Sequence, residues 1–204
     1  MRENQQSAGA LDLVLDPVTG QLDGTTLQST AGSYAYNDFG ELDYESYSHD
    51  GTTIYAVDYT YDGYGRIKTR VESIEGQTTI YTYEYEELSG RLWKVYENGD
   101  VDPIAVYDYD SNGNRISHAD YRGATPVVNN GSYDDQDRME SYGNAADGYA
   151  TYTYSANGEL ETKELNGQTT VYDYDVLGNL RQVDLPGGTT IEYIVDGRGR
   201  RVGK

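Results

Sequence analysis

Residues 59–67 read Tyr-Thr-Tyr-Asp-Gly-Tyr-Gly-Arg-Ile, and similar nine-residue stretches return along the chain at a nearly fixed interval. Within this stretch, Tyr61 stands four residues before Gly65. Aligned on these two positions, successive copies are separated by 21, 25, 24, 24, 24, 21, 20 and 21 residues. A period of this size is typical of stacked supersecondary units. The chain is therefore predicted to be a tandem-repeat protein.

About nine copies cover the chain, and no linker interrupts them. We therefore expect one repeat array over residues 11–204, preceded by a polar, disordered lead-in at residues 1–10. The copy at Tyr85 is one residue longer than the others, and the copy at Tyr133 carries Asp137 where the others have glycine. The anchor pairs are Leu15 with Gly20, Tyr36 with Gly40, Tyr61 with Gly65, Tyr85 with Gly90, Tyr109 with Gly113, Tyr133 with Asp137, Tyr154 with Gly158, Tyr174 with Gly178, and Val195 with Gly199.

Each copy begins with a strict two-residue alternation. Tyr55, Val57, Tyr59 and Tyr61 share one face of an extended chain, with polar residues between them. This pattern predicts antiparallel strands with one covered, aromatic face. The first copy has leucines at the equivalent positions and is predicted to cap the array.

A turn follows each alternating segment. In Asp62-Gly63-Tyr64-Gly65 an acidic acceptor begins the turn and a glycine stands where positive φ is expected. A second corner, such as Glu75-Gly76-Gln77, returns the chain to the next copy. The residues expected to build the repeat are Tyr34, Tyr36, Gly40, Tyr59, Tyr61, Asp62, Gly65, Tyr83, Tyr85, Gly90, Tyr107, Tyr109, Asp110, Gly113, Tyr152, Tyr154, Gly158, Tyr172, Tyr174, Asp175, Gly178 and Gly199.

The predicted fold class is all-β. The apolar residues of 92–95 and 180–183 are spaced by three, which indicates a β-bulge or strong local twist. We expect an antiparallel meander of β-hairpin repeats, 20–25 residues each, that curls into an open spiral or barrel-like strip. A β-propeller blade needs roughly 40 residues, about two of these repeats, and is the less favoured alternative.

Composition excludes several functions. The formal charge of −20 opposes binding to nucleic acid and to anionic lipid. No run is long and apolar enough to span a membrane, the first residues lack a signal-peptide pattern, and the chain has no cysteine. Because the chain starts and ends within the repeat, we expect a segment of a longer protein whose export signal lies elsewhere.

Three stretches carry a family resemblance: Tyr59-Thr60-Tyr61-Asp62 with Gly65, Tyr107-Asp108-Tyr109-Asp110 with Gly113, and Tyr172-Asp173-Tyr174-Asp175 with Gly178. They resemble the YD repeats of the Rhs family, and Asp196–Val202 is similar to the closing segment of such repeat regions. The resemblance implies a spiral strip of stacked hairpins. In large bacterial toxins and insecticidal toxin complexes such strips form a hollow shell, and in teneurins an adhesive barrel. It also implies export or a cell-surface location.

Two binding sites compete with this structural interpretation. Regularly spaced rings could stack on sugars, so a carbohydrate-binding or adhesion module is the alternative function, although rings on one face normally pack on each other. Tyrosines outside the ladder are the better candidates for a sugar site: Tyr64, Tyr121, Tyr142 and Tyr149.

A calcium loop is the second candidate. Asp108, Asp110, Asn112 and Gly113 match the opening of such a loop, but Ala119 stands where the loop needs glutamate. The turn chemistry already explains these residues, so we predict no metal and no cofactor. Another acidic corner is expected to be a solvated turn and contains Asp134, Asp135 and Asp137.

The sequence contains few residues of the kinds that usually carry catalysis. His49 and His118 are the only histidines, and no spacing singles out a catalytic pair. We therefore expect a non-catalytic structural module. Its expected partners are neighbouring repeats or a second copy, which would pair with the strand edges near Leu11–Leu15 and Tyr193–Val202.

Overall fold

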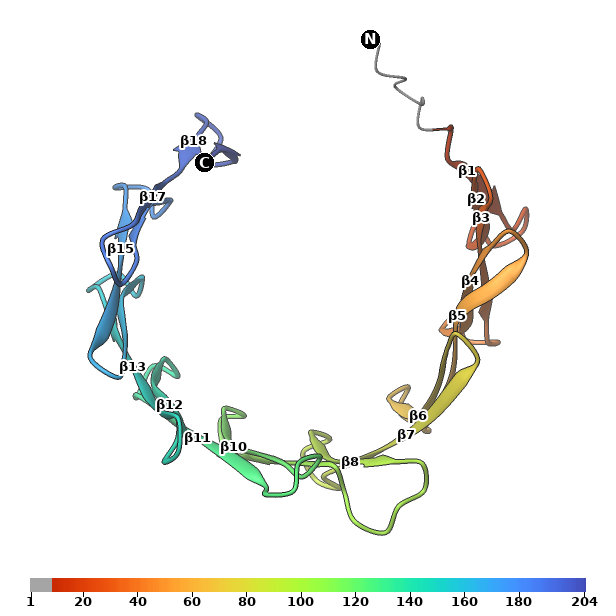
Figure 1. Ribbon diagram of the computed structural model, residues 1–204, viewed down its shortest axis with the longest axis horizontal. Coiled ribbons are helices and arrows are strands. Elements are labelled where there is room, and N and C mark those ends of the chain that lie inside the picture. The colour runs from red at the N-terminus through yellow and green to blue at the C-terminus, as the bar shows by residue number, and fades with distance from the viewer. Residues whose placement is uncertain (1–8) are drawn as a thin grey trace. The chain divides into compact units, whose positions relative to one another are not determined.

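The computed structural model describes residues 9–204, so most of the predicted lead-in lies outside the described residues. None of the described residues forms a helix, which confirms the all-β prediction. Consequently no candidate for a membrane-spanning helix exists in this part of the chain. The chain divides into two compact units, one ending at Ile104 and the other covering Ala105–Lys204, and each is described separately (Figure 1).

Unit 1 is an antiparallel meander in which each strand pairs with the strand that follows it in the chain. The tyrosine-rich alternating segments form β3, β5 and β7, as the period of two predicted. Its strands are β1 (Asp12–Leu15), β2 (Leu22–Leu27), β3 (Thr30–Tyr36), β4 (Leu42–His49), β5 (Thr52–Tyr61), β6 (Ile67–Ile74), β7 (Gln77–Tyr85) and β8 (Leu92–Glu97).

Unit 2 repeats this plan from β9 to β17, again with each strand paired to the next. The last two strands form a separate two-stranded sheet. Its strands are β9 (Ala105–Tyr109), β10 (Arg115–Asp120), β11 (Val127–Tyr133), β12 (Met139–Asn144), β13 (Gly148–Tyr154), β14 (Leu160–Leu165), β15 (Gln168–Tyr174), β16 (Leu180–Asp184), β17 (Thr190–Glu192), β18 (Ile194–Val195) and β19 (Arg201–Gly203).

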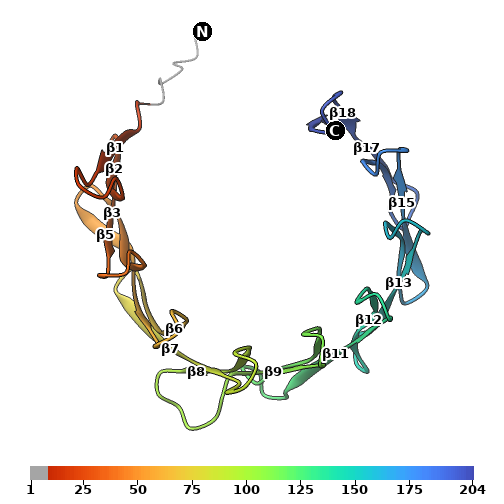
Figure 2. The same ribbon diagram turned by 180° about the vertical axis from the view of Figure 1, so that it is seen from behind.

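Within each unit the sheet curves along its strand order, as both sides of the ribbon show (Figures 1 and 2). Neither meander closes on itself, because β1 does not pair with β8 and β9 does not pair with β17 among the described residues. The predicted open meander of hairpins is therefore confirmed.

A β-bulge lies beside the second tyrosine of the repeat. Thr60 pairs with Thr69 but Tyr61 pairs with Ile67, so Lys68 has no residue opposite it. The bulges predicted within Leu92–Val95 and Leu180–Val183 are confirmed, and equivalent shifts occur beside the other repeat tyrosines. Because a bulge increases local twist, a bulge in each repeat gives the sheet a physical reason to curve.

The two faces of the sheet differ as the alternation predicted. In β5, Tyr55, Val57 and Tyr59 are half-buried or buried, whereas Asp58 and Thr60 are exposed. We call the first side the tyrosine face. The register keeps the ladder on one side in successive hairpins.

The prediction of a covered face needs correction, because neither unit has a second layer. The accessible surface is 14154 Å², whereas a compact protein of this mass exposes about 9,500 Å². The tyrosine face is thus covered only by its own side chains. Among residues 9–204 the buried apolar residues are Val57, Val95, Ala105, Ala119, Ala150 and Val183.

Two kinds of turn join the strands. Long turns such as Asp62–Arg66 connect β5 to β6, and Gly65 and Gly113 have φ of +76° and +102°, as the turn pattern predicted. Short corners such as Glu75-Gly76 have two consecutive residues at positive φ, which is typical of type I′ hairpins. Because the two kinds alternate along a meander, the long turns of one unit all lie at the same end of its strands.

Candidate functional site: stacked turns and a tyrosine face

Asp62 organises the long turn between β5 and β6. Its Oδ1 accepts hydrogen bonds from the backbone N–H groups of Tyr64 (2.9 Å) and Arg66 (3.1 Å). Arg66 also turns its guanidinium back onto Oδ2, with Nε at 2.8 Å and Nη2 at 2.7 Å. Partial desolvation raises the pKa of the Asp62 carboxyl, but together the hydrogen bonds from Arg66 and Tyr64 lower it below the ordinary aspartate value.

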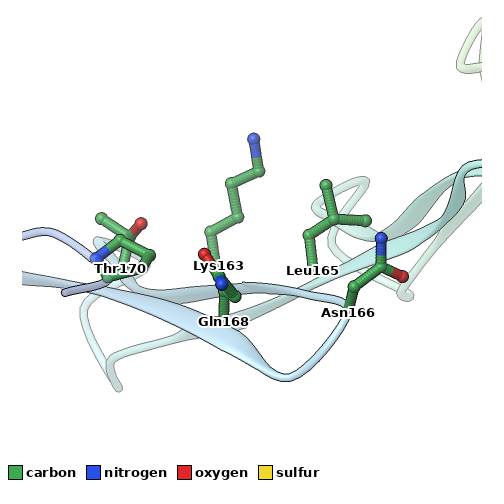
Figure 3. Close-up of a pocket in the computed structure, with 6 residues that line it drawn as sticks. Lys163, Leu165, Asn166, Gln168 and Thr170 are labelled. Carbon is green, nitrogen blue, oxygen red and sulfur yellow. The ribbon is translucent and has the colours of Figure 1, made fainter.

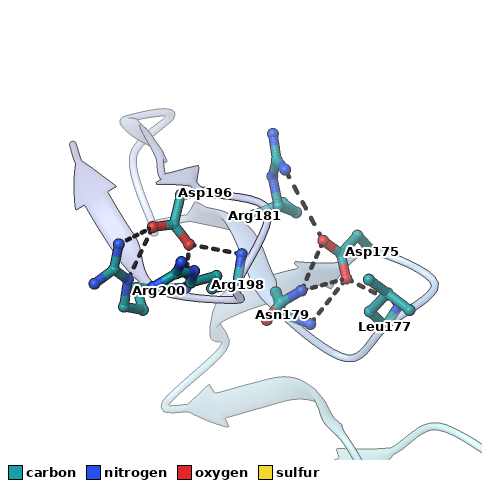
Figure 4. A network of polar contacts seen from close by, with 7 residues as sticks. All are labelled: Asp175, Leu177, Asn179, Arg181, Asp196, Arg198 and Arg200. Carbon is teal, nitrogen blue, oxygen red and sulfur yellow. Dashed lines mark hydrogen bonds and ion pairs between the residues drawn. The ribbon is translucent and has the colours of Figure 1, made fainter.

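The first and fifth residues of the long turn are complementary in several repeats. In the five-residue turns that begin with aspartate, the fifth residue is a donor, and Figure 4 shows this for Asp175 with Asn179 and for Asp196 with Arg200. Where the turn begins with a donor, the fifth residue is glutamate. The other pairs are Asp110 with Asn114, Asp134 with Arg138, Asn37 with Glu41, and Ser155 with Glu159.

Consecutive long turns of unit 1 touch one another. Gln21 Nε2 donates to the Gly40 carbonyl at 3.2 Å. A Cβ added to Gly65 would stand 2.8 Å from Glu41 Oε1, and one added to Gly90 would stand 3.2 Å from an Arg66 nitrogen. The last residue of one turn therefore packs against the glycine of the next, which stacks the turns along one end of the strands.

Asp137 is the exception to the glycine pattern, and the stacking explains it. Its φ is +60°, the left-handed conformation that aspartate tolerates better than most residues. The side-chain amides of Asn112 and Asn114 donate to its Oδ1 at 2.8 and 2.7 Å. The carboxylate thus bonds the preceding turn directly, which glycine could not do.

The second tyrosine of the repeat bonds the preceding repeat. The Tyr85 hydroxyl donates to the Ile67 carbonyl at 2.7 Å, beside the bulge. Since a bulge disrupts the regular ladder, a carbonyl at this place gains a partner from the side chain. The equivalent bonds run from Tyr36 to Leu22, Tyr61 to Leu42, Tyr133 to Arg115, and Tyr154 to Met139.

Arginines of the turns also contact these rings. The guanidinium carbon of Arg66 lies 4.3 Å from the centre of the Tyr85 ring, and that of Arg138 lies 5.0 Å from the Tyr154 ring. These distances are within cation–π range. Arg66 therefore joins the aspartate of its own turn to the tyrosine of the next repeat.

A cluster of tyrosine rings packs together on the tyrosine face of β3, β4 and β5. The hydroxyls of Tyr34 and Tyr47 lie 3.1 Å apart, and their rings meet edge to face at 6.2 Å. Tyr55 lies 5.9 Å from Tyr47 on the other side. The hydrogen bond with Tyr34, followed by desolvation, raises the pKa of Tyr47 to about 12.

The structure places the predicted repeat residues consistently. The ladder tyrosines lie on β3, β5, β7, β9, β13 and β15. Gly40, Gly90, Gly158, Gly178 and Gly199 have positive φ, like Gly65 and Gly113. Sequence reasoning missed the fifth turn residues. The sequence does contain this pattern, because in the five-residue turns a first residue that accepts hydrogen bonds is matched by a fifth residue that donates them, and the reverse.

The calcium hypothesis is not supported. Asp110 Oδ1 accepts three backbone N–H groups, at 2.8 to 2.9 Å, and Oδ2 accepts the Asn114 amide. The carboxylate is thus already engaged by donors that a cation would have to displace. The acidic corner at Asp134 is likewise a turn, held by Gln136 and Arg138. No cluster suited to a metal ion occurs among residues 9–204.

The histidines lie on strands. His118 stacks on Tyr107 at 4.8 Å on the tyrosine face. His49 is within 3.3 Å of both Ser29 and Thr30 through Nδ1, and its Nε2 is 3.5 Å from Asp50. This resembles the composition of a hydrolase triad, but the His49 and Asp50 side chains are 57% and 76% exposed. It therefore lacks the burial that orients a catalytic histidine.

The four tyrosines considered for sugar binding are divided between the two units. Tyr64 is exposed at a turn of unit 1, and Tyr121 and Tyr149 are exposed in unit 2. Tyr142 is instead half-buried on β12, where Arg115 lies 5.8 Å from its ring. The sequence predicts Tyr142 outside the ladder, but the register places it on the tyrosine face opposite Gly131.

A shallow depression lies on the tyrosine face of β14 and β15, beyond the last aromatic position. Lys163, Leu165, Gln168 and Thr170 stand on the same side of the hairpin (Figure 3). Asn166 and Pro186 complete its lining. No aromatic ring lines it, so it offers no stacking platform for a sugar.

These features define a class of protein. The hairpins stack in a single layer, and contacts between their turns and from tyrosine hydroxyls join each repeat to the next. Such a layer is a wall built from repeats. The sequence profile of the Teneurin YD-shell family matches residues 5–204. The chain belongs to this family.

Individual relatives agree with this assignment. Teneurin-3 of Mus musculus is 31% identical over 173 residues, which cover 82% of this chain and 6% of that protein. The tRNA3(Ser)-specific nuclease WapA of Bacillus spizizenii is 29% identical over 187 residues, covering 74% and 8%. A crystal structure of TcdB2-TccC3-TEV shares the fold, with a TM-score of 0.62, 19% identity, and coverage of 94% of this chain and 13% of that one. The chain therefore spans a small part of each.

Proposed function

We propose that the chain is a non-catalytic wall segment of an Rhs-type β-spiral shell. The observation that carries the proposal is the repeat-to-repeat clasp, in which Tyr85 bonds the Ile67 carbonyl while Arg66 reaches the Tyr85 ring. Such a clasp stabilises stacking of the next repeat on the preceding one. The continuous sequence period supports one array over residues 11–204, and the family resemblance supports export.

The nuclease activity in the name of WapA is not transferred to this chain. The aligned region is 8% of that protein, and the formal charge of −20 opposes binding to the phosphates of tRNA. Incubation of the chain with tRNA should leave the RNA intact. Cleavage that tracks the purified chain would contradict the non-catalytic assignment.

Assembly through strand edges is the second part of the proposal. Among the described residues of unit 1, β1 pairs with β2 alone, and Leu11, Leu13, Val14 and Leu15 are all more than half exposed. An apolar strand with an unpaired edge is a template for another strand. The occupant we propose is a strand of a neighbouring repeat, from a longer polypeptide or from a second copy.

Light scattering over a concentration series tests this assembly. The mass should rise with concentration, and more so at high salt, because screening weakens the repulsion between chains of charge −20. Leu13→Lys/Val14→Lys should keep the chain monomeric. Val101→Lys is the control, since Val101 is 93% exposed outside any strand. A wild-type mass that stays monomeric at every concentration and salt would remove the assembly proposal.

A further inference from the structure

The long turns of unit 1 carry apolar side chains at the same position, two residues after each turn begins. Val18, Phe39, Tyr64 and Leu88 are 90%, 89%, 86% and 102% exposed. We call these four residues the tip row. Single exposed apolar residues are ordinary on proteins, but here an apolar side chain recurs at one position of four successive turns, which favours an interaction surface.

The tip row is regularly spaced because its turns are stacked. Gln21 bonds the turn of Phe39 through the Gly40 carbonyl. Glu41 packs against Gly65, and Arg66 packs against Gly90. Neighbouring long turns are two strands apart, so the tips recur about every 10 Å and the row extends about 29 Å.

The turn itself does not require apolar tips. At this position only the backbone N–H bonds the first turn residue, as in Val18 to Asp16, Phe39 to Asn37 and Tyr64 to Asp62. In unit 2 the same position holds Asn112, Gln136, Asn157, Leu177 and Arg198. The corners at the opposite strand ends of unit 1 begin with polar residues and glycine, and the longest of them, which starts at Asn98-Gly99, also exposes Val101; the others are Gln28-Ser29, Asp50-Gly51 and Glu75-Gly76.

The spacing and charge of the row indicate its partner. Seven residues of α-helix rise about 10.5 Å, which matches the spacing of the tips, and about 20 residues span the whole row. Exposed Asp38 and Glu87 stand beside the tips, and the chain as a whole carries −20. A second copy, or an anionic lipid surface, would bring like charges together. We propose that the tip row binds a basic amphipathic α-helix of a partner protein.

A synthetic helix tests the proposal on the full chain. The probe is a dye-labelled peptide of about 21 residues, with leucines at heptad a and d positions and lysines elsewhere. Its binding is followed by fluorescence anisotropy at low and high salt. A second peptide has the same composition in shuffled order, without the apolar stripe. We expect saturable binding of the striped peptide that weakens with salt, and at least about tenfold weaker binding of the shuffled one.

Matched variants locate the site. Phe39→Ser/Leu88→Ser should weaken binding of the striped peptide by about tenfold or more. Val176→Ser/Leu177→Ser changes two residues that are 102% and 83% exposed on a turn of unit 2, and should leave binding unchanged. All four residues are exposed, so both variants should retain the wild-type Tm. No binding by the wild-type chain, equal binding of the shuffled peptide, or equal loss in both variants would overturn the proposal. So would self-association that the tip substitutions abolish, because the occupant would then be a second copy.

Discussion

Single residues hold the long turns in a conformation that few side chains adopt. Gly65 has φ of +76°, and Asp137 reaches +60° only with two asparagine amides bonded to its carboxylate. Gly63, in the same turn as Gly65, lacks positive φ, and nothing lies within 4 Å of a Cβ placed on it. The two glycines of one turn therefore serve different purposes.

Gly65→Ala should destabilise the chain. The left-handed conformation costs a non-glycine residue about 1–2 kcal/mol, and the added Cβ would stand 2.8 Å from Glu41 Oε1. Thermal unfolding measures the effect, and Gly63→Ala is the control expected to keep the wild-type Tm. Equal Tm values for the two variants would contradict the assigned role of Gly65.

The turn aspartates should titrate below the ordinary aspartate pKa. Hydrogen bonds lower the pKa of Asp62, Asp134 and Asp196 from 3.8. Because the folded-state pKa is depressed, the stability these carboxylates contribute is present above pH 3.8 and is lost as the pH falls through the folded-state values. Carboxyl-carbon NMR titration checks this. A midpoint at or above 3.8 for all three would refute it.

Tyr47 should titrate late in alkali. Its hydrogen bond with Tyr34 raises the pKa of Tyr47 to about 12, so the associated stability is present below pH 10 and declines as the pH rises toward 12. Tyr34→Phe should lower this pKa in a spectrophotometric titration. Tyr64→Phe, at an exposed turn tip, should leave the Tyr47 titration in place.

Elements are joined to one another by the complementary first and fifth turn residues. The pair Asp62–Arg66 and the pair Asn37–Glu41 exchange the roles of donor and acceptor within the same turn geometry. A hairpin therefore needs a complementary pair, not particular residues. The tyrosine hydroxyl adds a second link, beside the bulge that bends each hairpin.

A double-mutant cycle tests the pairing. Arg66→Glu should lower Tm, because it places a second carboxylate beside Asp62. Asp62→Asn/Arg66→Glu recreates the Asn37–Glu41 pair and should recover part of the loss, but not all of it, since Arg66 also contacts Tyr85. Additive losses in the double variant would show that the pair is not coupled.

Deleting one oxygen atom removes the hydrogen bond between the tyrosine hydroxyl and the preceding repeat. Tyr85→Phe deletes the bond to the Ile67 carbonyl and should cost about 1 kcal/mol, measured by denaturant unfolding. Hydrogen exchange should quicken in β6 and β7 relative to β3. Tyr64→Phe removes the same atom at an exposed tip and should be neutral.

The described part of the molecule consists of single-layered sheets, so little of its apolar surface is buried when it folds. Among residues 9–204 six apolar residues are buried, and all six have small side chains: the alanines Ala105, Ala119 and Ala150 and the valines Val57, Val95 and Val183. Rings that pack against each other at a wet surface replace an aliphatic core.

This predicts an unusual calorimetric signature. The heat capacity change of unfolding should fall below the usual 12–15 cal/mol/K per residue, because that value arises mainly from newly exposed apolar surface. Differential scanning calorimetry, compared with a compact protein of similar length, measures it. A value in the ordinary range would indicate that the tyrosine face is buried in solution.

The sequence by itself determined the repeat, the strand alternation, the positive φ of the turn glycines and two of the bulges. Each of these is local: a period of two, a glycine at a fixed offset, or a three-residue apolar spacing fixes it without distant contacts. Only the tertiary structure decided what lies between repeats. Four features depend on residues that the pairing register of the strands brings together. They are the bond from Tyr85 to Ile67, the pairing of Asp137 with the preceding turn, the half-burial of Tyr142 and the alignment of the tip row. Register depends on bulges and turn lengths summed over neighbouring hairpins, so no single stretch of sequence contains it.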